Sequence, residues 1–170
     1  MQNEQLTILK NQSHPLDLSG KACAFTGHRE LDADFSARKL KREIKRLITL
    51  GITTFYNGVA MGFDLLSAEY VLECKKKFPH IRLIVCIPCY AQEKYYPEKD
   101  KARYANILKN ADEQVLLSDH YYRGCMQNRD RYMADRADVL LAYCNKETGG
   151  AAYTVRYFQK THDNSAIFFI

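Results

Sequence analysis

The strongest constraint on the fold is a regular alternation of short apolar runs with longer segments of helical spacing. The runs at Ala22–Thr26, Ile81–Ile87 and Val139–Tyr143 have the length and composition of buried strands. Between them, segments such as 35–50 place apolar residues at helical spacing. This order predicts right-handed βαβ crossovers, and therefore an α/β three-layer sandwich with a mostly parallel sheet and helices on both faces.

The same patterns predict the extent of each element and the number of domains. A chain of 170 residues is typical of one domain, and no linker rich in Gly, Ser or Pro divides it. We expect an N-terminal arm at residues 1–20 and a single domain at 21–170. We expect strands at 22–26, 53–56, 81–87, 113–117, 139–143 and 166–170, and helices at 35–50, 63–77, 101–110, 123–136 and from 150 onward.

Composition excludes several classes of protein. The chain is 46% hydrophobic and 26% charged, which argues against disorder, collagen and coiled coils. No apolar run approaches the roughly 20 residues of a membrane span.

The polar N-terminus lacks a secretory pattern, so we expect a cytoplasmic protein whose six cysteines are reduced thiols. Cys86 and Cys89 have no second pair at metal-binding spacing, so we expect no metal site. The net charge of +5 suits an anionic ligand or solubility.

Ligands of such sheets bind beyond the carboxyl ends of the strands, so we expect the binding residues in the loops there. The first loop contains Gly27, His28 and Arg29. Gly27 allows a sharp turn, Arg29 offers a planar fork suited to phosphate, and His28 is a second donor. The alternative is a tight strand exit with a solvated arginine.

Two further loops place glycines before a helix, where free N–H groups can hold an anion. The segment from Asn57 to Asp64 contains Gly58 and Gly62, and it matches neither the dinucleotide fingerprint nor the P-loop. Asp64 either accepts from ribose hydroxyls or complements the helix dipole. Glu69, one turn later, has a surface or packing role as its simpler interpretation.

The third loop is Gly149-Gly150, followed by small residues that leave room for a phosphate. Arg129 shares helical spacing with Met126 and Met133, so it should lie on or beside the sheet-facing stripe. A charge there needs a partner, and a ligand phosphate or Asp64 is a candidate.

Aromatic residues cluster in two loops near the expected ligand edge, at Tyr95-Tyr96 and Tyr121-Tyr122. They either stack on a base or act as lids and packing.

The ordered motifs Thr26–Arg29, Asn57–Asp64, Arg129–Leu140 and Gly149–Tyr153 resemble the YpsA-type proteins of the SLOG superfamily, over about residues 20–170. That superfamily includes the "Lonely guy" phosphoribohydrolases and the DNA-processing protein DprA. The resemblance implies a bacterial protein with a Rossmann-like sheet and a nucleotide-derived ligand, such as an ADP-ribose-like or NAD-like molecule.

The phosphoribohydrolase pattern is matched only in part. Arg129 occupies the position of the functional arginine in these relatives, and Gly149 and Gly150 fit their glycine loop. Val155 and Arg156 stand where the two carboxylates of that loop should be. Those carboxylates would stabilise a cationic sugar, which valine cannot do. The resemblance therefore favours binding over hydrolysis.

Three functions remain open. The first is binding or sensing of a nucleotide-derived ligand by residues at the strand ends. The second is an N-glycosidic hydrolase with Asp64 or Glu69 as the acid, and the third is an interaction protein with a vestigial nucleotide site.

Nucleic acid is the least expected partner, because no basic stripe interleaved with aromatics is obvious. A homodimer is one alternative for the oligomeric state. The expected ligand-binding residues are Gly27, His28, Arg29, Asn57, Gly58, Gly62, Asp64, Arg129, Gly149 and Gly150.

Overall fold

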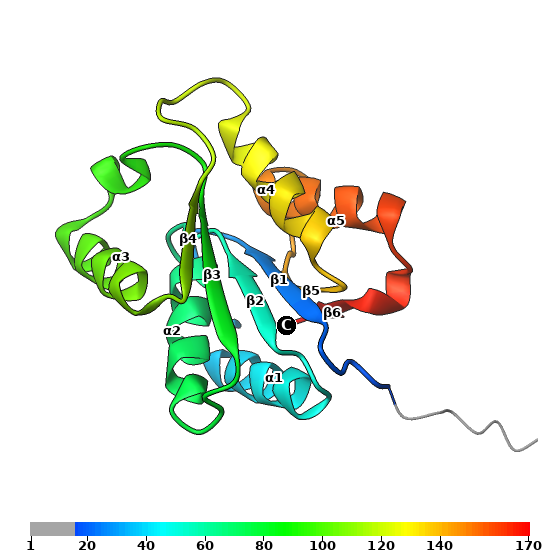
Figure 1. Cartoon of the computed structure of the whole chain (residues 1–170). Helices are drawn as coiled ribbons and strands as arrows, with labels where there is room; N and C mark the ends of the chain where they lie inside the picture. Colours follow the sequence, from blue (N-terminus) through cyan, green and yellow to red (C-terminus); the bar gives the residue numbers. More distant parts are fainter. Residues whose placement is uncertain (1–15) are drawn as a thin grey trace, which may run out of the picture.

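A computed structural model describes residues 16–170 (Figure 1). Residues 1–15 of the expected N-terminal arm lie outside the described residues. The remainder of the arm packs on the domain: Leu18 is buried, and its N–H donates to the carbonyl oxygen of Leu50 at 2.8 Å. The N–H of Gly20 donates to the carbonyl oxygen of Gly51 at 3.0 Å. Residues 18–20 are therefore attached to the turn that precedes the second strand.

The predicted alternation of strands and helices is confirmed, with most ends within two residues of expectation. One helix begins at Glu98 rather than at Lys101. Pro97 directly precedes it, and the proline ring fixes the backbone φ angle at the position where the helix begins. Two short 3-10 helices, Gln92–Tyr95 and Asn164–Ala166, are not predicted by periodicity. The elements are β1 Ala22–Gly27, α1 Ala37–Thr49, β2 Thr54–Asn57, α2 Phe63–Lys75, β3 Arg82–Ile87, α3 Glu98–Asn110, β4 Glu113–Leu116, α4 Cys125–Arg136, β5 Val139–Tyr143, α5 Gly150–Thr161 and β6 Ile167–Phe169.

The six strands form one sheet in the order β4-β3-β2-β1-β5-β6, and all neighbouring pairs are parallel. Helices α1, α2 and α3 cover one face, and α4 and α5 cover the other (Figure 1). The fold is therefore the expected three-layer, Rossmann-like sandwich. The chain moves outward from β1 to β4 and then returns to place β5 beside β1, so the topological switch point lies between β1 and β5.

The core on each face follows from the alternation of side chains along the strands. Cys23 and Phe25 of β1 join the apolar cluster under α1 and α2, whereas Ala24 joins the cluster under α4 and α5. The larger residues thus face the three-helix layer, and the smaller one faces the two-helix layer. Because helices cover both faces of the sheet, the sequences of the central strands are continuous apolar runs.

No helix among residues 16–170 is long and apolar enough to cross a membrane.

The exit of β1 is held tightly against the first residue of α2. The N–H of Phe63 donates to the carbonyl oxygen of His28 at 3.1 Å. Gly62 precedes this helix at φ 77°, a backbone conformation that side chains with a Cβ rarely adopt. A Cβ on Gly62 would lie 2.1 Å from the carbonyl oxygen of Arg29. The loop after β1 can therefore approach α2 only because residue 62 is a glycine.

We expect Gly62→Ala to destabilise the fold more than Gly149→Ala does. Gly149 also has positive φ, at 96°, but a Cβ there would meet no atom within 4 Å. Gly149→Ala should then cost only backbone strain, about 1–3 kcal/mol. Gly62→Ala adds displacement of the Arg29 backbone, about 1–3 kcal/mol more. Urea unfolding followed by circular dichroism measures both, and equal losses in the two variants would contradict this account.

Candidate functional site

A cavity of about 330 Å³ opens at the switch point, where the loops after β1 and β5 meet the starts of α2 and α4. We refer to it as the crevice. Its position agrees with the rule that open α/β sheets bind ligands beyond the carboxyl ends of their strands. The crevice is lined by Phe25, Thr26, Gly27, His28, Arg29, Ala60, Asp64, Met126, Gln127, Arg129, Asp130, Gly150 and Ala151.

The first turns of three helices contribute to this lining. Asp64 belongs to the first turn of α2, Met126 and Gln127 to that of α4, and Gly150 and Ala151 to that of α5. None of these helices has a side-chain cap that accepts from its first N–H groups. Each helix N-terminus carries a partial positive charge. The three together make the crevice favourable for an anion.

Arg129 is buried on α4, as the spacing of Met126 and Met133 predicts. Its Nε donates to Asp130 Oδ1 at 2.7 Å, and its Nη1 donates to the carbonyl oxygen of Gly58 at 2.7 Å. Asp130, which sequence reasoning did not consider, is therefore the ion-pair partner within the described residues. Gly58 fits here because a Cβ would lie 2.4 Å from Arg129 Nη1.

Asp64 is the one carboxyl of α2 that reaches the crevice. Its Oδ1 is buried and has no hydrogen-bond partner among the described residues, while Oδ2 accepts from the N–H of Ala60 at 3.4 Å. Burial raises the pKa of this carboxyl to about 7; Asp130 adds to the rise, and Arg129 opposes it. Asp64 is therefore largely protonated below neutral pH and is a potential donor.

The loop after β1 supplies the remaining polar groups. Arg29 is exposed at the mouth of the crevice. His28 Nε2 accepts the N–H of Asn145 at 3.1 Å, which leaves Nδ1 as the ring nitrogen that can donate. Burial lowers the pKa of His28, so the ring is uncharged at neutral pH. Among the residues that line the crevice, Arg29 therefore carries the positive side-chain charge that is not already paired, because Arg129 is paired with Asp130.

Asn57 organises the loop after β2 instead of lining the crevice. The buried amide donates from Nδ2 to the carbonyl oxygen of Asp64 and to Ser67 Oγ, each at 3.0 Å. Its Oδ1 accepts the N–H of Val59 at 2.8 Å and so helps to hold Val59 at φ 46°. A β-branched residue at positive φ is strained. Asn57 therefore helps to fix the loop that presents Gly58 to Arg129.

The predicted ligand residues thus divide into two groups. Those that line the crevice are Gly27, His28, Arg29, Asp64, Arg129 and Gly150. Those that support it without lining it are Asn57, Gly58, Gly62 and Gly149.

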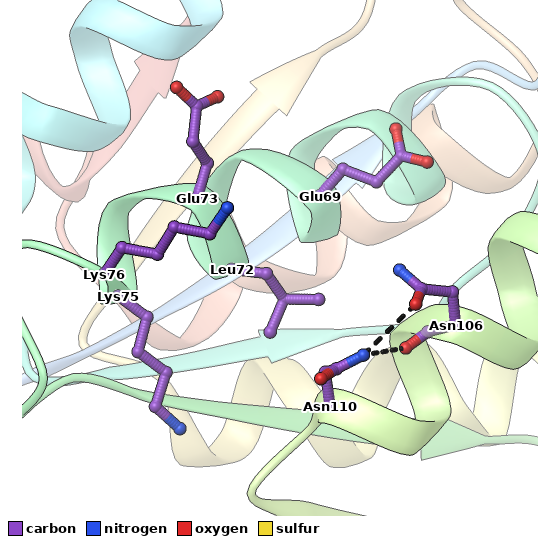
Figure 2. A pocket seen from close by; sticks show the side chains of 7 residues that line it. All are labelled: Glu69, Leu72, Glu73, Lys75, Lys76, Asn106 and Asn110. Carbon is purple, nitrogen blue, oxygen red and sulfur yellow. Dashed lines mark hydrogen bonds between the residues drawn. The ribbon is translucent and has the colours of Figure 1, made fainter.

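Glu69, the second acid considered for catalysis, lies away from the crevice. It forms a two-bond ion pair with Arg103 of α3, at 2.7 and 2.8 Å. Figure 2 shows it at a different cavity, between α2 and α3, beside Leu72 and Asn106. Glu69 follows Asp64 by five positions, and this spacing places them on different sides of the helix. Glu69 therefore joins two helices and has no access to a ligand in the crevice.

Another cavity, of about 580 Å³, adjoins the crevice and is distinct from the cavity between α2 and α3. We name it the tyrosine cavity. Arg29 and Met126 line both cavities. The expected aromatic residues Tyr95, Tyr96 and Tyr121 line the tyrosine cavity, whereas Tyr122 does not. Sequence reasoning missed Tyr90, Gln92 and Lys94, which also line it. They come from the loop and 3-10 helix after β3, for which no periodic signal exists.

The cysteines are unpaired, and two positions of α5 carry residues other than carboxylates. All six cysteines are free, and burial raises the pKa of Cys86 to about 12. No group of three His, Cys, Asp or Glu residues in 16–170 is arranged to hold a metal ion. Val155 is buried in the core, and Arg156 is exposed and donates to the carbonyl oxygen of Glu147. These two positions of α5 therefore supply no carboxylate to a ligand.

Solved structures of similar fold include DNA processing protein A from Helicobacter pylori, described for its single-stranded DNA binding mode. It has a TM-score of 0.66 and 20% identity, and the match covers 89% of this chain and 65% of that one. At this identity the likeness shows the fold alone. The present chain thus spans less than two thirds of that protein. This neighbour gives no support to our prediction that nucleic acid ranks last among the partners.

Sequence relatives agree on one family. A UPF0398 protein from Brevibacillus brevis is 30% identical over 131 residues, which are 75% of this chain and 70% of the relative. The UPF0398 protein YpsA from Bacillus subtilis is 27% identical over 165 residues, which are 88% of this chain and 92% of the relative. The family model described as the YspA SLOG family matches residues 24–170. The chain therefore belongs to the YpsA family of SLOG proteins.

Proposed function

We propose that this protein binds or senses a nucleotide-derived ligand and that the crevice holds the ligand's phosphate. The observation that carries this proposal is the convergence of three helix N-termini and the guanidinium groups of Arg29 and Arg129 on one cavity. Main-chain N–H groups and guanidinium groups are the donors that phosphate oxygens need. The net charge of +5 also favours an anionic ligand.

The protonated state of Asp64 supports the same proposal. A carboxylate in the crevice would repel a phosphate, whereas a carboxylic acid donates a hydrogen bond to it. Burial keeps the proton on Asp64 up to about neutral pH. The crevice can then present donors on several sides, with Asp130 neutralised by Arg129.

A second candidate function rests on the same carboxyl. A buried acid whose pKa lies near 7 is suited to general acid catalysis. In N-glycosidic hydrolysis, Asp64 would give its proton to the leaving base, and the water that adds to C1 of the ribose would return a proton to the Asp64 carboxylate. The absence of carboxylates at Val155 and Arg156 argues against this reaction, because nothing at those positions stabilises the cationic sugar.

We expect Arg29→Gln to weaken binding of ADP-ribose, NAD and AMP without loss of fold. Arg29 is exposed, so its removal strands no buried charge, whereas Arg129 also neutralises Asp130 and is unsuitable for this test. A ligand at 100 times its Kd should stabilise the wild type by about 2.7 kcal/mol in a thermal-shift assay. The shift should fall in Arg29→Gln and persist in Arg42→Gln, an exposed arginine on α1. No shift with any of the three ligands would contradict the proposal.

We expect Asp64 to make the stability of the wild type fall as the pH rises. The unfolded carboxyl ionises near 3.8 and the folded one near 7, so between these values the folded state holds the extra proton. Stability should therefore decrease from about pH 4 to about pH 7 and level off above. Relative to Asp64→Asn, the wild type should lose about 2–3 kcal/mol between pH 5 and pH 8.

Urea unfolding of both proteins at these two pH values measures this difference. The comparison removes groups common to both proteins, such as His28, whose lowered pKa acts in the opposite direction. Parallel pH profiles for the wild type and Asp64→Asn would contradict the buried, proton-holding carboxyl.

The enzymatic candidate predicts release of free base from AMP, detected by chromatography. Wild-type protein should release base, and Asp64→Asn should not, because asparagine has no proton to give. Glu69→Gln is the matched control and should react at the wild-type rate. Absence of base release by the wild type excludes this candidate.

A further inference from the structure

The tyrosine cavity shares its boundary with the crevice. Arg29 and Met126 line both cavities. The carbonyl oxygen of Gly58 accepts from Arg129 Nη1 at 2.7 Å on one side and from Gln92 Nε2 at 3.0 Å on the other. A ligand whose phosphate lies near Arg29 therefore has the tyrosine cavity as the adjoining space for its remaining atoms. The volume of the tyrosine cavity, about 580 Å³, is in the ordinary range of ligand sites.

The walls of this cavity present aromatic surface to solvent. Tyr90, Tyr95 and Tyr121 are 74%, 86% and 71% exposed. Tyr90 and Tyr95 follow β3, and Tyr121 comes from the loop before α4; both segments lie at the top of the view in Figure 1. Tyr96 is instead buried, and its hydroxyl donates to the carbonyl oxygen of Val59. Exposed aromatic faces around a cavity are suited to stacking on a flat base.

Gln92, which lines the tyrosine cavity, carries a hydrogen-bond acceptor that is not satisfied within the part of the chain that the structure describes. Its Oε1 is buried and has no hydrogen-bond partner among the described residues. The bond from Nε2 to the Gly58 carbonyl fixes which end of the amide is the acceptor. A buried acceptor without a donor is costly, and a ligand N–H group would satisfy it. The exocyclic amino group of a base is such a donor.

We propose that the tyrosine cavity is the base subsite of this protein and that it takes a base carrying an exocyclic amino group, of which adenine is an example. The inference rests on the nucleotide-binding function proposed above. In this arrangement Tyr95 and Tyr121 stack on the base, Gln92 accepts from its amino group, and Arg29 lies between base and phosphate. Lys94, whose Nζ lies 5.3 Å from the Tyr95 ring centroid, adds positive charge at the rim.

Calorimetric titration with AMP, IMP and ribose 5-phosphate tests this subsite. Wild type should bind AMP at least tenfold more tightly than ribose 5-phosphate, which lacks a base. IMP, with an oxo group in place of the amino group, should bind more weakly than AMP. Gln92→Leu should bring the affinities for AMP and IMP together.

The tyrosine variants separate the base from the phosphate. Tyr95→Ala and Tyr121→Ala should each weaken AMP binding about tenfold and leave ribose 5-phosphate unchanged. Tyr122→Ala, in the same loop but outside the cavity, should alter neither affinity. Arg29→Gln should weaken all three ligands.

Two results overturn the base subsite alone: equal affinity of wild type for AMP and ribose 5-phosphate, or unchanged AMP binding in both Tyr95→Ala and Tyr121→Ala. Failure of the wild type to bind any of AMP, IMP, ribose 5-phosphate, ADP-ribose and NAD overturns the proposed function as well. Tighter binding of a single-stranded oligonucleotide than of AMP, with affinity that grows with its length, also overturns the subsite, because the cavity would then be part of a path for a strand.

Discussion

The hydrogen bond from the Arg129 guanidinium to the Gly58 carbonyl connects the parts of this structure that matter for function. It joins α4, on one face of the sheet, to the loop between β2 and α2. Because the guanidinium is also paired with Asp130, the bond places a neutralised ion pair beside the buried carboxyl of Asp64. The same carbonyl holds Gln92, so the two adjoining cavities depend on one main-chain oxygen.

The backbone around this bond is shaped to allow it. Gly58 has no Cβ to block the approach of Arg129, and Val59 accepts a strained conformation in return. Asn57 satisfies the local N–H and carbonyl groups that this turn would otherwise leave unpaired. Strained backbone is commonly found where a binding site must be held rigidly. The loop after β2 therefore contributes geometry, and the charge comes from other segments.

Local patterns were enough to predict the fold and part of the site. The short apolar runs predicted the buried strands, and the helical spacing of Arg129 with Met133 predicted the side of α4 on which Arg129 lies. The positions of glycines before helices also predicted where N–H groups gather. What these signals share is that neighbours in sequence determine them.

Pairings between distant segments have no such local signal. The partner of Glu69 is Arg103, on another helix, and the partner of Gln92 is the main chain of Gly58. The sequence pattern predicts a surface or packing role for Glu69, in the middle of α2, but it does not identify the partner. The packing of α3 against α2 makes Glu69 a half-buried ion-pair partner, whereas Asp64 is a buried carboxyl.

Burial of Asp64 does not by itself separate binding from catalysis. Its raised pKa comes mainly from loss of water, which suits a donor to a bound anion as well as an acid catalyst. Cleavage of a glycosidic bond further needs negative charge next to the sugar, and the carboxylate of Asp130 is already neutralised by Arg129. A crevice whose available groups are donors stabilises a phosphate in the ground state. It offers little to a developing cation, and this difference favours the proposed binding function over the proposed hydrolysis.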